Sequence, residues 1–398
     1  MLKIIGFFSV IALFACTKQM PTPPIVVAPP VVVPPVVTDA RTFYKPETFV
    51  MGGDLSYINQ IEDNGGIYQD SSKAKDPYKL LKNRGMNCVR VRLWHTPQWS
   101  AALNSQGKMY SNLEDVSKTI RRAKQQGMSV NLSIHYSDTW ADPSKQKLPA
   151  AWENLTSSEL QDSVYQYTFS VLQILDKQGL TPEMVQIGNE TNNGMLFPLG
   201  SVKNNNFQPF AELLKSGIKA VRDFSTKATI KPKIILHVAQ FQNADWWFDG
   251  VITKGGVTDF DILGISHYYK WSTVNAMSDI GNKIKNLKSK YNKKVMIVET
   301  AFTWTNQWAD NYNNYMSSTS PVEGYEISPE GQQKYLKDLT QTVISAGGSG
   351  VMYWEPAWIT SSMKDLWGTG SSWENNTLFD FKGNVLPSVS FMTEKYSF

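Results

Sequence analysis

The chain has 398 residues, of which 41% are hydrophobic and 19% charged, and this composition is that of a globular protein rather than a disordered or fibrous one. Its formal net charge is only +4 at pH 7, and no run of Lys and Arg is dense enough for a nucleic-acid-binding patch, so we expect no nucleic acid partner. The 13 Trp residues fit a protein whose ligand presents flat apolar faces, as sugar rings do.

Residues 1–15 have the features of a bacterial signal peptide. Lys3 supplies the positive start, and the apolar run 4–15 is too short to span a bilayer. The run ends in Leu-Phe-Ala-Cys, which is similar to the lipobox of lipoproteins, so we expect Cys16 to become a lipidated N-terminus. An ordinary secretory signal, cleaved after Ala15, is the alternative.

A linker follows over residues 16–40. From residue 21 it is built mainly of Pro and Val, which favour the extended polyproline II conformation and make a semi-rigid spacer. We expect this spacer to hold a single catalytic domain, residues 41–398, away from a membrane.

Eight short apolar runs recur along that domain, and each ends in a polar or aromatic cluster before a helix-like segment. The runs end at or near Asp54, Trp94, Asp138, Glu190, Gln240, Tyr268, Glu299 and Trp354. Between them lie amphipathic stretches such as 113–127, which closes with Gly127 as a helix C-cap does. This alternation predicts a parallel sheet closed into a (β/α)8 barrel.

A doubly wound open sheet is the alternative fold. The first run is followed by "GGDLSY", which is not the Gly-rich phosphate loop of such folds, and this favours the barrel. In a barrel all the polar strand ends face one mouth, and they then form one site.

Two glutamates are the best candidates for chemistry in that mouth. Glu190 ends the fourth predicted strand and Glu299 the seventh, and strands three apart in a ring of eight face each other. Their carboxyl groups could approach to about 5 Å, the separation that a retaining glycosidase needs for its acid/base and its nucleophile. Glu355 could compete, but it alternates with Trp354, so it should turn outward and be structural if Trp354 lines the mouth.

Other chemistries find little support in the sequence. There are only 4 His residues and no HExxH motif, so we expect no catalytic metal and no required cofactor. The segment 309–314, "ADNYNN", within the long loop 307–329, offers oxygen ligands for a structural calcium, with an ordinary polar surface loop as the alternative. No GxSxG motif is present, and Cys88 lies inside a strand-like run where it should be buried.

Four motifs give the chain a resemblance to a known family. The segments "HYSDTWADP" (135–143), "IGNE" (187–190), "VETAFTWT" (298–305) and "YWEPAWI" (353–359) resemble glycoside hydrolase family 53, the endo-β-1,4-galactanases. The segment "FDFKGNVLPS" (379–388) is similar to that family's C-terminal signature. The likeness extends over nearly all of residues 45–395 in chain order.

The resemblance implies a role for each candidate site residue. Glu190 matches the acid/base, Glu299 the nucleophile, and Arg90 an arginine beside the nucleophile. Asn189 matches the residue that binds the sugar 2-hydroxyl. The remaining substrate-binding candidates are Asp54, His135, Asp138, Trp140, Tyr268 and Trp354. The resemblance also implies a cis peptide bond between Trp354 and Glu355.

The predicted function is therefore endo-acting, retaining hydrolysis of β-1,4-galactosidic bonds in galactan and arabinogalactan I side chains of pectin. The predicted location is the bacterial outer membrane or cell surface, with the lipid on Cys16 as the anchor. Another retaining β-1,4-glycanase, acting on mannan or glucan, is one alternative. A surface lipoprotein that binds glycans without cleaving them is another.

Overall fold

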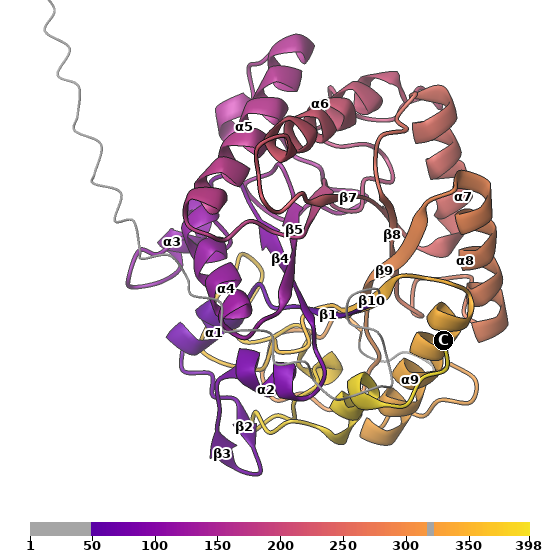
Figure 1. Cartoon of the computed structure of the whole chain (residues 1–398). Coiled ribbons are helices and arrows are strands. Elements are labelled where there is room, and N and C mark those ends of the chain that lie inside the picture. Colours follow the sequence, from indigo (N-terminus) through magenta and orange to yellow (C-terminus); the bar gives the residue numbers. More distant parts are fainter. Residues whose placement is uncertain (1–48, 317–321) are drawn as a thin grey trace, which may run out of the picture.

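Eight parallel strands close into a barrel in the computed structural model of the protein, which describes residues 49–316 and 322–398 (Figure 1). In chain order the strands are β1 (Val50–Asp54), β4 (Cys88–Leu93), β5 (Ser129–Ile134), β6 (Met184–Ile187), β7 (Lys233–Ala239), β8 (Ile262–His267), β9 (Lys294–Thr300) and β10 (Gly350–Tyr353). Each lies within one of the eight predicted apolar runs. The predicted (β/α)8 barrel is confirmed, and the open sheet is excluded, because β1 pairs with both β4 and β10.

Helices surround the strands as an outer ring (Figure 1). They are α1 (Ile58–Asp63), α2 (Pro77–Asn83), α3 (Gln98–Ala102), α4 (Leu113–Gln125), α5 (Ser157–Lys177), α6 (Gln208–Ser225), α7 (Phe241–Asp249), α8 (Met277–Tyr291) and α9 (Pro329–Ser345). Shorter elements are the hairpin β2 (Gln69–Asp70) and β3 (Lys73–Ala74), the 3-10 turns η1 (Ala150–Trp152), η3 (Glu374–Asn376) and η4 (Pro387–Thr393), and the π-helical turn η2 (Gly250–Lys254).

Local sequence signals explain where several helices begin and end. The side chain of Asn112 accepts a hydrogen bond from the backbone of Asp115 and caps α4, while Thr156 and Glu159 form a capping box at the start of α5. The predicted helix end at Gly127 is present two residues after α4, where the glycine adopts a φ of 68° that other residues rarely take.

Two layers of apolar side chains support the barrel. The larger layer lies between strands and helices. A smaller cluster draws only on strand residues and fills the inside of the barrel: Cys88, Met184, Ile235, Ile262, Met296, Val298 and Met352. Cys88 is therefore buried, as predicted. Because side chains alternate along a strand, Arg90 lies on the same inward face as Cys88, two residues nearer the mouth. The apolar cluster therefore fills the barrel interior below the polar residues of the site.

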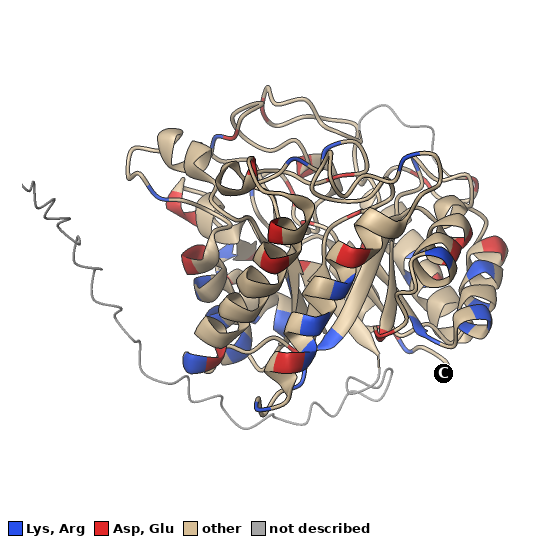
Figure 2. Cartoon of the chain, turned by 90° about the horizontal axis from the view of Figure 1, so that it is seen from above, with Lys and Arg blue, Asp and Glu red and all other residues tan. Residues whose placement is uncertain are grey.

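The longer loops collect at one end of the barrel, and Lys/Arg and Asp/Glu residues are interspersed on the helices around its sides (Figure 2). Within residues 49–316 and 322–398, no helix is both long and apolar enough to cross a membrane. The predicted signal peptide, Cys16 and the linker 16–40 lie outside the described residues, and so do residues 317–321 of the long loop.

Candidate active site

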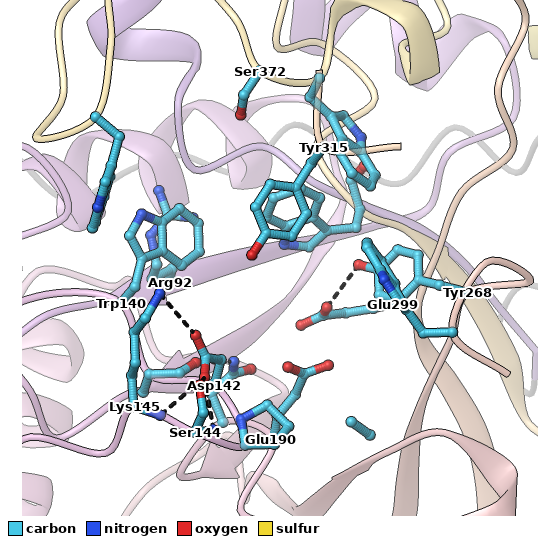
Figure 3. Close-up of a pocket in the computed structure, with 18 of the residues that line it drawn as sticks. Arg92, Trp140, Asp142, Ser144, Lys145, Glu190, Tyr268, Glu299, Tyr315 and Ser372 are labelled. Atoms are coloured by element: carbon cyan, nitrogen blue, oxygen red, sulfur yellow. Dashed lines mark hydrogen bonds and ion pairs between the residues drawn. The ribbon is translucent and has the colours of Figure 1, made fainter. Parts of the chain in front are cut away.

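A pocket of about 900 Å³ opens at the carboxyl ends of the strands (Figure 3). Its lining is rich in aromatic side chains, which come from strand ends and from distant loops: Trp140, Tyr268, Trp271, Tyr312, Tyr315, Trp354, Trp358, Trp367 and Trp373. Such a surface, with a few charged groups at its base, suits a ligand that has both apolar faces and hydroxyl groups.

Most of the predicted site residues line this pocket. They are Arg90, His135, Trp140, Asn189, Glu190, Tyr268, Glu299 and Trp354. Two predicted residues, Asp54 and Asp138, are not part of the lining. Glu355 is also absent from it, in keeping with the structural role predicted for that residue.

Glu299 reaches the pocket because of an irregularity in the sheet. The register between β8 and β9 pairs Ile265 with Ile297 but Ser266 with Glu299, so Val298 is skipped as in a β-bulge. Val298 belongs to the cluster inside the barrel, and strict alternation would turn the next residue outward. The bulge instead turns the Glu299 side chain toward the mouth.

The carboxylate of Glu299 is held by two donors. Arg90 Nη2 lies 2.8 Å from Oε1, and the Tyr268 hydroxyl donates to Oε2 at 2.8 Å. Burial raises the pKa of Glu299 above its ordinary value of 4.5, whereas Arg90 and Tyr268 act to lower it. Charge-assisted contacts of this length favour the ionised form.

Asp54 supports this arrangement from below. Its carboxylate is fully buried and accepts a hydrogen bond from Arg90 Nη1 at 2.6 Å. The sequence predicted that Asp54 would bind substrate, but the structure places it behind Arg90, where it fixes the guanidinium. The reason is register: Asp54 of β1 lies directly beside Arg90 of β4.

Glu190 enters the pocket from the opposite wall. It follows β6 through Gly188, whose φ is 76°, and itself has a φ of 45°, a conformation that non-glycine residues rarely adopt. Its backbone N–H donates to His237 Nδ1 at 3.2 Å, which helps to hold the turn. In Figure 3 the carboxyl groups of Glu190 and Glu299 point toward one another.

The two carboxyl groups therefore have different tendencies to hold a proton. Burial and, second, the negative charge of Glu299 raise the pKa of Glu190 to about 8. The same Arg90 that contacts Glu299 has a smaller, opposing influence on Glu190. At neutral pH Glu190 thus holds its proton, while the contacts of Glu299 with Arg90 and Tyr268 favour the ionised form of that second carboxyl group.

Asn189 and His135 are also fixed within the pocket. Asn189 Oδ1 accepts from Arg90 Nη2 at 2.7 Å, and its Nδ2 donates to the carbonyl of Ala141 at 2.8 Å. Burial, followed by the charges of Arg92 and Arg90, lowers the pKa of His135 well below 6.5, so this ring is neutral. Its Nδ1 is buried and has no hydrogen-bond partner among the described residues.

Arg92 is a pocket residue that the sequence analysis did not single out. Its guanidinium carbon lies 4.2 Å from the ring centroid of Trp140 and 4.4 Å from that of Tyr57. Glu355 is not turned outward to solvent: it is buried and its Oε1 lies 3.2 Å from Arg92 Nη1. The ion pair of Arg92 and Glu355 therefore packs against the Trp140 ring and helps to orient it. Period-two alternation from Arg90 could have identified Arg92 as an inward residue.

Asp138 holds a loop rather than a ligand. Its two carboxylate oxygens accept hydrogen bonds from the backbone N–H groups of Thr96 and Ala150, at 2.9 and 2.8 Å. These bonds fix the chain just before Trp140. The prediction that Asp138 lines a subsite rested on its place after a strand, and a loop residue is not bound by strand alternation.

The predicted cis bond between Trp354 and Glu355 is wrong. Among the described residues the cis bond is at Phe197–Pro198, and the chain after Trp354 instead turns through a φ of 44° at Glu355. Trp354 still lines the pocket, where its ring packs edge-on against Trp373 with centroids 4.6 Å apart.

Residues of the segment 309–314 connect neighbouring loops and also line the pocket. Asp310 accepts from the backbone N–H of Tyr312 at 2.8 Å and of Ser371 at 2.8 Å, and it also bonds to Thr360. Residues 49–316 and 322–398 contain no group of three or more acidic, His or Cys side chains placed to hold a metal ion. The carboxylate that was a calcium candidate instead joins two loops of the chain.

Comparison with protein families and curated proteins gives a consistent result. The model of glycosyl hydrolase family 53 matches residues 50–392. The chain is 44% identical over 353 residues to an arabinogalactan endo-β-1,4-galactanase of Cellvibrio japonicus, covering 87% of this chain and 91% of that protein. It is 32% identical over 378 residues to an endo-β-1,4-galactanase of Bacillus subtilis, covering 86% and 84%.

Solved structures agree with this result. A family 53 catalytic domain of Ignisphaera aggregans superposes with a TM-score of 0.79 at 35% identity, covering 92% of this chain and all of that one. A structure from a study of two fungal β-1,4-galactanases has a TM-score of 0.74 at 30% identity, with coverage of 87% and 99%.

Proposed function

The chain belongs to glycosyl hydrolase family 53, and on that basis we propose that it is an endo-β-1,4-galactanase that cleaves galactan and arabinogalactan I side chains of pectin with retention of configuration. The observation that carries the proposal is the pair Glu190 and Glu299, one protonated and one ionised, facing each other in an aromatic pocket. No cofactor is needed, because these two groups supply both an acid and a nucleophile.

In the first step Glu299 Oε2 or Oε1 attacks the anomeric carbon of the bound galactose. The bond from that carbon to the glycosidic oxygen breaks, and Glu190 gives its proton to the departing oxygen. The product is a glycosyl ester on Glu299, and Glu190 is left as a carboxylate. Arg90 and Tyr268, which hold the Glu299 carboxylate, keep it aimed from one side.

In the second step Glu190 acts as a base. It takes a proton from a water molecule, whose oxygen attacks the anomeric carbon and breaks the ester to Glu299. Two inversions give net retention. We infer that Asn189, which is held by Arg90 and Ala141, binds the sugar 2-hydroxyl through a hydrogen bond that strengthens as positive charge develops on the ring.

The aromatic walls suit the shape of this substrate. Galactose has an axial 4-hydroxyl, so a β-1,4-galactan chain bends at each linkage, unlike flat cellulose. Trp140 and Trp354 lie with ring centroids 5.8 Å apart on one side, and Trp271 and Tyr315 lie 5.7 Å apart elsewhere in the lining. Rings on several walls can stack on successive sugars of a curved chain.

Product analysis tests this function. The purified protein should release galacto-oligosaccharides of intermediate size from β-1,4-galactan, as an endo-acting enzyme does, and should release few reducing ends from mannan or cellulose. Activity on mannan without activity on galactan would contradict the substrate assignment. Tight binding of galactan with no new reducing ends would instead identify a glycan-binding protein.

The pH dependence should differ between two classes of substrate. Cleavage needs Glu190 protonated and Glu299 ionised, so kcat/KM on galactan should fall as pH rises through the pKa of Glu190, which lies at about 8. A dinitrophenyl glycoside of β-1,4-galactotriose needs no proton at its leaving oxygen. The fall in kcat/KM at high pH should therefore be much smaller for this substrate. Rates across pH for both substrates check this. The same alkaline limb for both would mean that Glu190 is not the acid.

We also propose that the protein is exported and attached to the outer membrane by lipid on Cys16. The support is the positively charged start, the short apolar run and the Leu-Phe-Ala-Cys sequence, followed by the Pro- and Val-rich linker 16–40. Cys16→Ser should move the protein from the membrane fraction to the soluble fraction, with kcat on galactan unchanged. Mass spectrometry of the N-terminus measures the lipid, and a free, unmodified Cys16 in the wild-type protein would contradict the anchor.

A further inference from the structure

The two glutamates divide the mouth of the barrel into two halves. Glu190 follows β6 and Glu299 lies on β9, and in the closed order of strands β7 and β8 lie between them on one side. On the other side lie β10, β1, β4 and β5. Trp140 and Tyr268 accordingly occupy opposite sides of the cavity in Figure 3. A polymer that is cut between the two glutamates must extend into both halves.

The proposed function places the reacting sugar in the half that contains β4 and β5. Asn189, which we infer to bind the 2-hydroxyl of that sugar, accepts from Arg90 of β4 and donates to the carbonyl of Ala141 in the loop after β5. The 2-hydroxyl is on the carbon next to the anomeric carbon. The leaving group must therefore extend into the half that contains β7 and β8, which we call the leaving-group half.

An exposed aromatic pair lies in the leaving-group half. Trp271, in the loop after β8, and Tyr315, in the loop after β9, both line the pocket, and they are 39% and 64% exposed. Their ring centroids are 5.7 Å apart, and the ring planes are inclined by 62°. Trp271 also packs at 5.4 Å against Tyr268, whose hydroxyl contacts Glu299. The pair therefore begins one ring away from the residue that holds the nucleophile, and its exposed faces can stack on sugars.

Hydrogen bonds fix the backbone of both residues, although their rings are exposed. The carbonyl of Trp271 accepts from the side chain of Gln242 at 3.0 Å. The N–H of Tyr315 donates to the carbonyl of Ser372 at 2.9 Å, and its own carbonyl accepts from Lys270 Nζ at 2.8 Å. Aromatic residues that are already held in place lose little conformational freedom when a ligand binds, so the pair is a preformed surface.

We propose that Trp271 and Tyr315 form a subsite for galactosyl units on the leaving-group side of the cleaved bond, and that Lys270 is a positioning residue for Tyr315. The proposal rests on the proposed galactanase function. Lys270 is not part of the pocket lining, so it acts through the loop that carries Tyr315. Because the two rings are inclined to each other, they can meet consecutive sugars of a chain that bends at each linkage.

The test compares galactan with β-1,4-galactotriosyl fluoride, whose small leaving group occupies no sugar subsite in the leaving-group half. Trp271→Ala and Tyr315→Ala should each lower kcat/KM on galactan by about 10-fold or more, mainly through KM, because each removes a stacking surface. Both variants should keep the wild-type rate on the fluoride. Tyr315→Phe retains the ring and should stay close to wild type on both substrates. Reducing ends and released fluoride measure the two rates.

Trp246→Ala is the matched control. Trp246, on α7, is 44% exposed, much like Trp271, but it is not part of the pocket lining. This variant should leave both rates unchanged. The rate on the fluoride also reports the folding of every variant, because that reaction needs both glutamates in place.

Lys270→Met separates positioning from direct binding. Methionine keeps much of the side-chain length but has no donor, so KM on galactan should rise with little change in kcat, and Lys270→Arg should restore part of the loss. In the Tyr315→Ala background, Lys270→Met should add no further loss, because no ring is left to position. Additive losses would overturn the positioning role of Lys270.

Transfer to a sugar acceptor probes the same subsite in the reverse direction. An acceptor that attacks the glycosyl-enzyme binds where the leaving group was bound, by microscopic reversibility. Galactobiose added to the wild-type protein and the fluoride should therefore yield a pentasaccharide. At the same galactobiose concentration, Trp271→Ala and Tyr315→Ala should yield less of it.

The remaining outcomes separate this proposal from the proposed function. Equal losses on galactan and on the fluoride would place the two rings on the other side of the cleaved bond. Unchanged rates on galactan and unchanged transfer in both variants would mean that the rings form no subsite. Either result overturns the proposal and leaves the enzyme a galactanase. A wild-type protein that cleaves neither substrate contradicts the proposed function itself.

Discussion

Glu299→Ala should reduce kcat on galactan by about 10,000-fold or more, and it should affect activated aryl substrates as severely. The reason is that no other group can form the glycosyl ester: Glu299 is the carboxylate that Arg90 and Tyr268 aim into the pocket. Initial rates on galactan and on the dinitrophenyl trioside measure the loss. The exposed Glu330, at the start of α9, offers a control, since Glu330→Ala should retain wild-type rates.

Azide distinguishes loss of the nucleophile from loss of folding. In Glu299→Ala a small anion can enter the space left by the carboxylate and attack the aryl trioside from that face. The product should be an α-configured glycosyl azide, and its appearance should restore part of the lost rate. An inactive variant with wild-type unfolding behaviour and no azide product would contradict the assignment of Glu299 as nucleophile.

Glu190→Ala should discriminate between substrates. On galactan the rate should fall by about 1,000-fold or more, because the sugar leaving group needs a proton that no other group supplies. On the dinitrophenyl trioside the first step should survive, since that leaving group departs without a proton. A burst of dinitrophenol equal to the enzyme concentration should be followed by a slow steady state, because the base for the second step is missing. Stopped-flow absorbance measures both phases.

The same anion gives the opposite stereochemistry in this variant. Glu299 still forms the ester, so azide attacks from the Glu190 side and yields a β-configured product. If Glu190→Ala gave the α-azide and Glu299→Ala the β-azide, the acid/base and nucleophile would have to be exchanged. The pair of variants therefore tests both assignments with one reagent.

Strand positions and strand ends could be read from the sequence because each strand is a short apolar run that closes in a polar cluster. The same pattern placed Glu190 and Glu299 at one mouth. The pattern did not predict the side-chain direction of residues that lie outside regular strands. Asp138 belongs to a loop, and Glu355 itself adopts a left-handed φ of 44°, so neither side chain was placed correctly by strand geometry.

Side-chain contacts that depend on the register of neighbouring strands could not be predicted. The relation of Glu190, His237 and Ser266 depends on the register of three neighbouring strands, which hydrophobic patterns do not specify. The bulge that turns Glu299 inward is likewise a property of paired strands. Trp358 and Trp373 enter the pocket from loops after the last strand, where no periodic signal guides a prediction.

The pairing of β1 with β10 has a consequence for the order of folding during synthesis. The strand Val50–Asp54 is made well before its partner Gly350–Tyr353. At about 5 to 20 residues per second, the roughly 300 residues between them take on the order of 15 to 60 s to translate. Throughout that interval the edge of β1 that β10 will cover has no partner, and the barrel cannot close. For a protein that we propose to be exported, this delay leaves the nascent polypeptide open until β10 has been made.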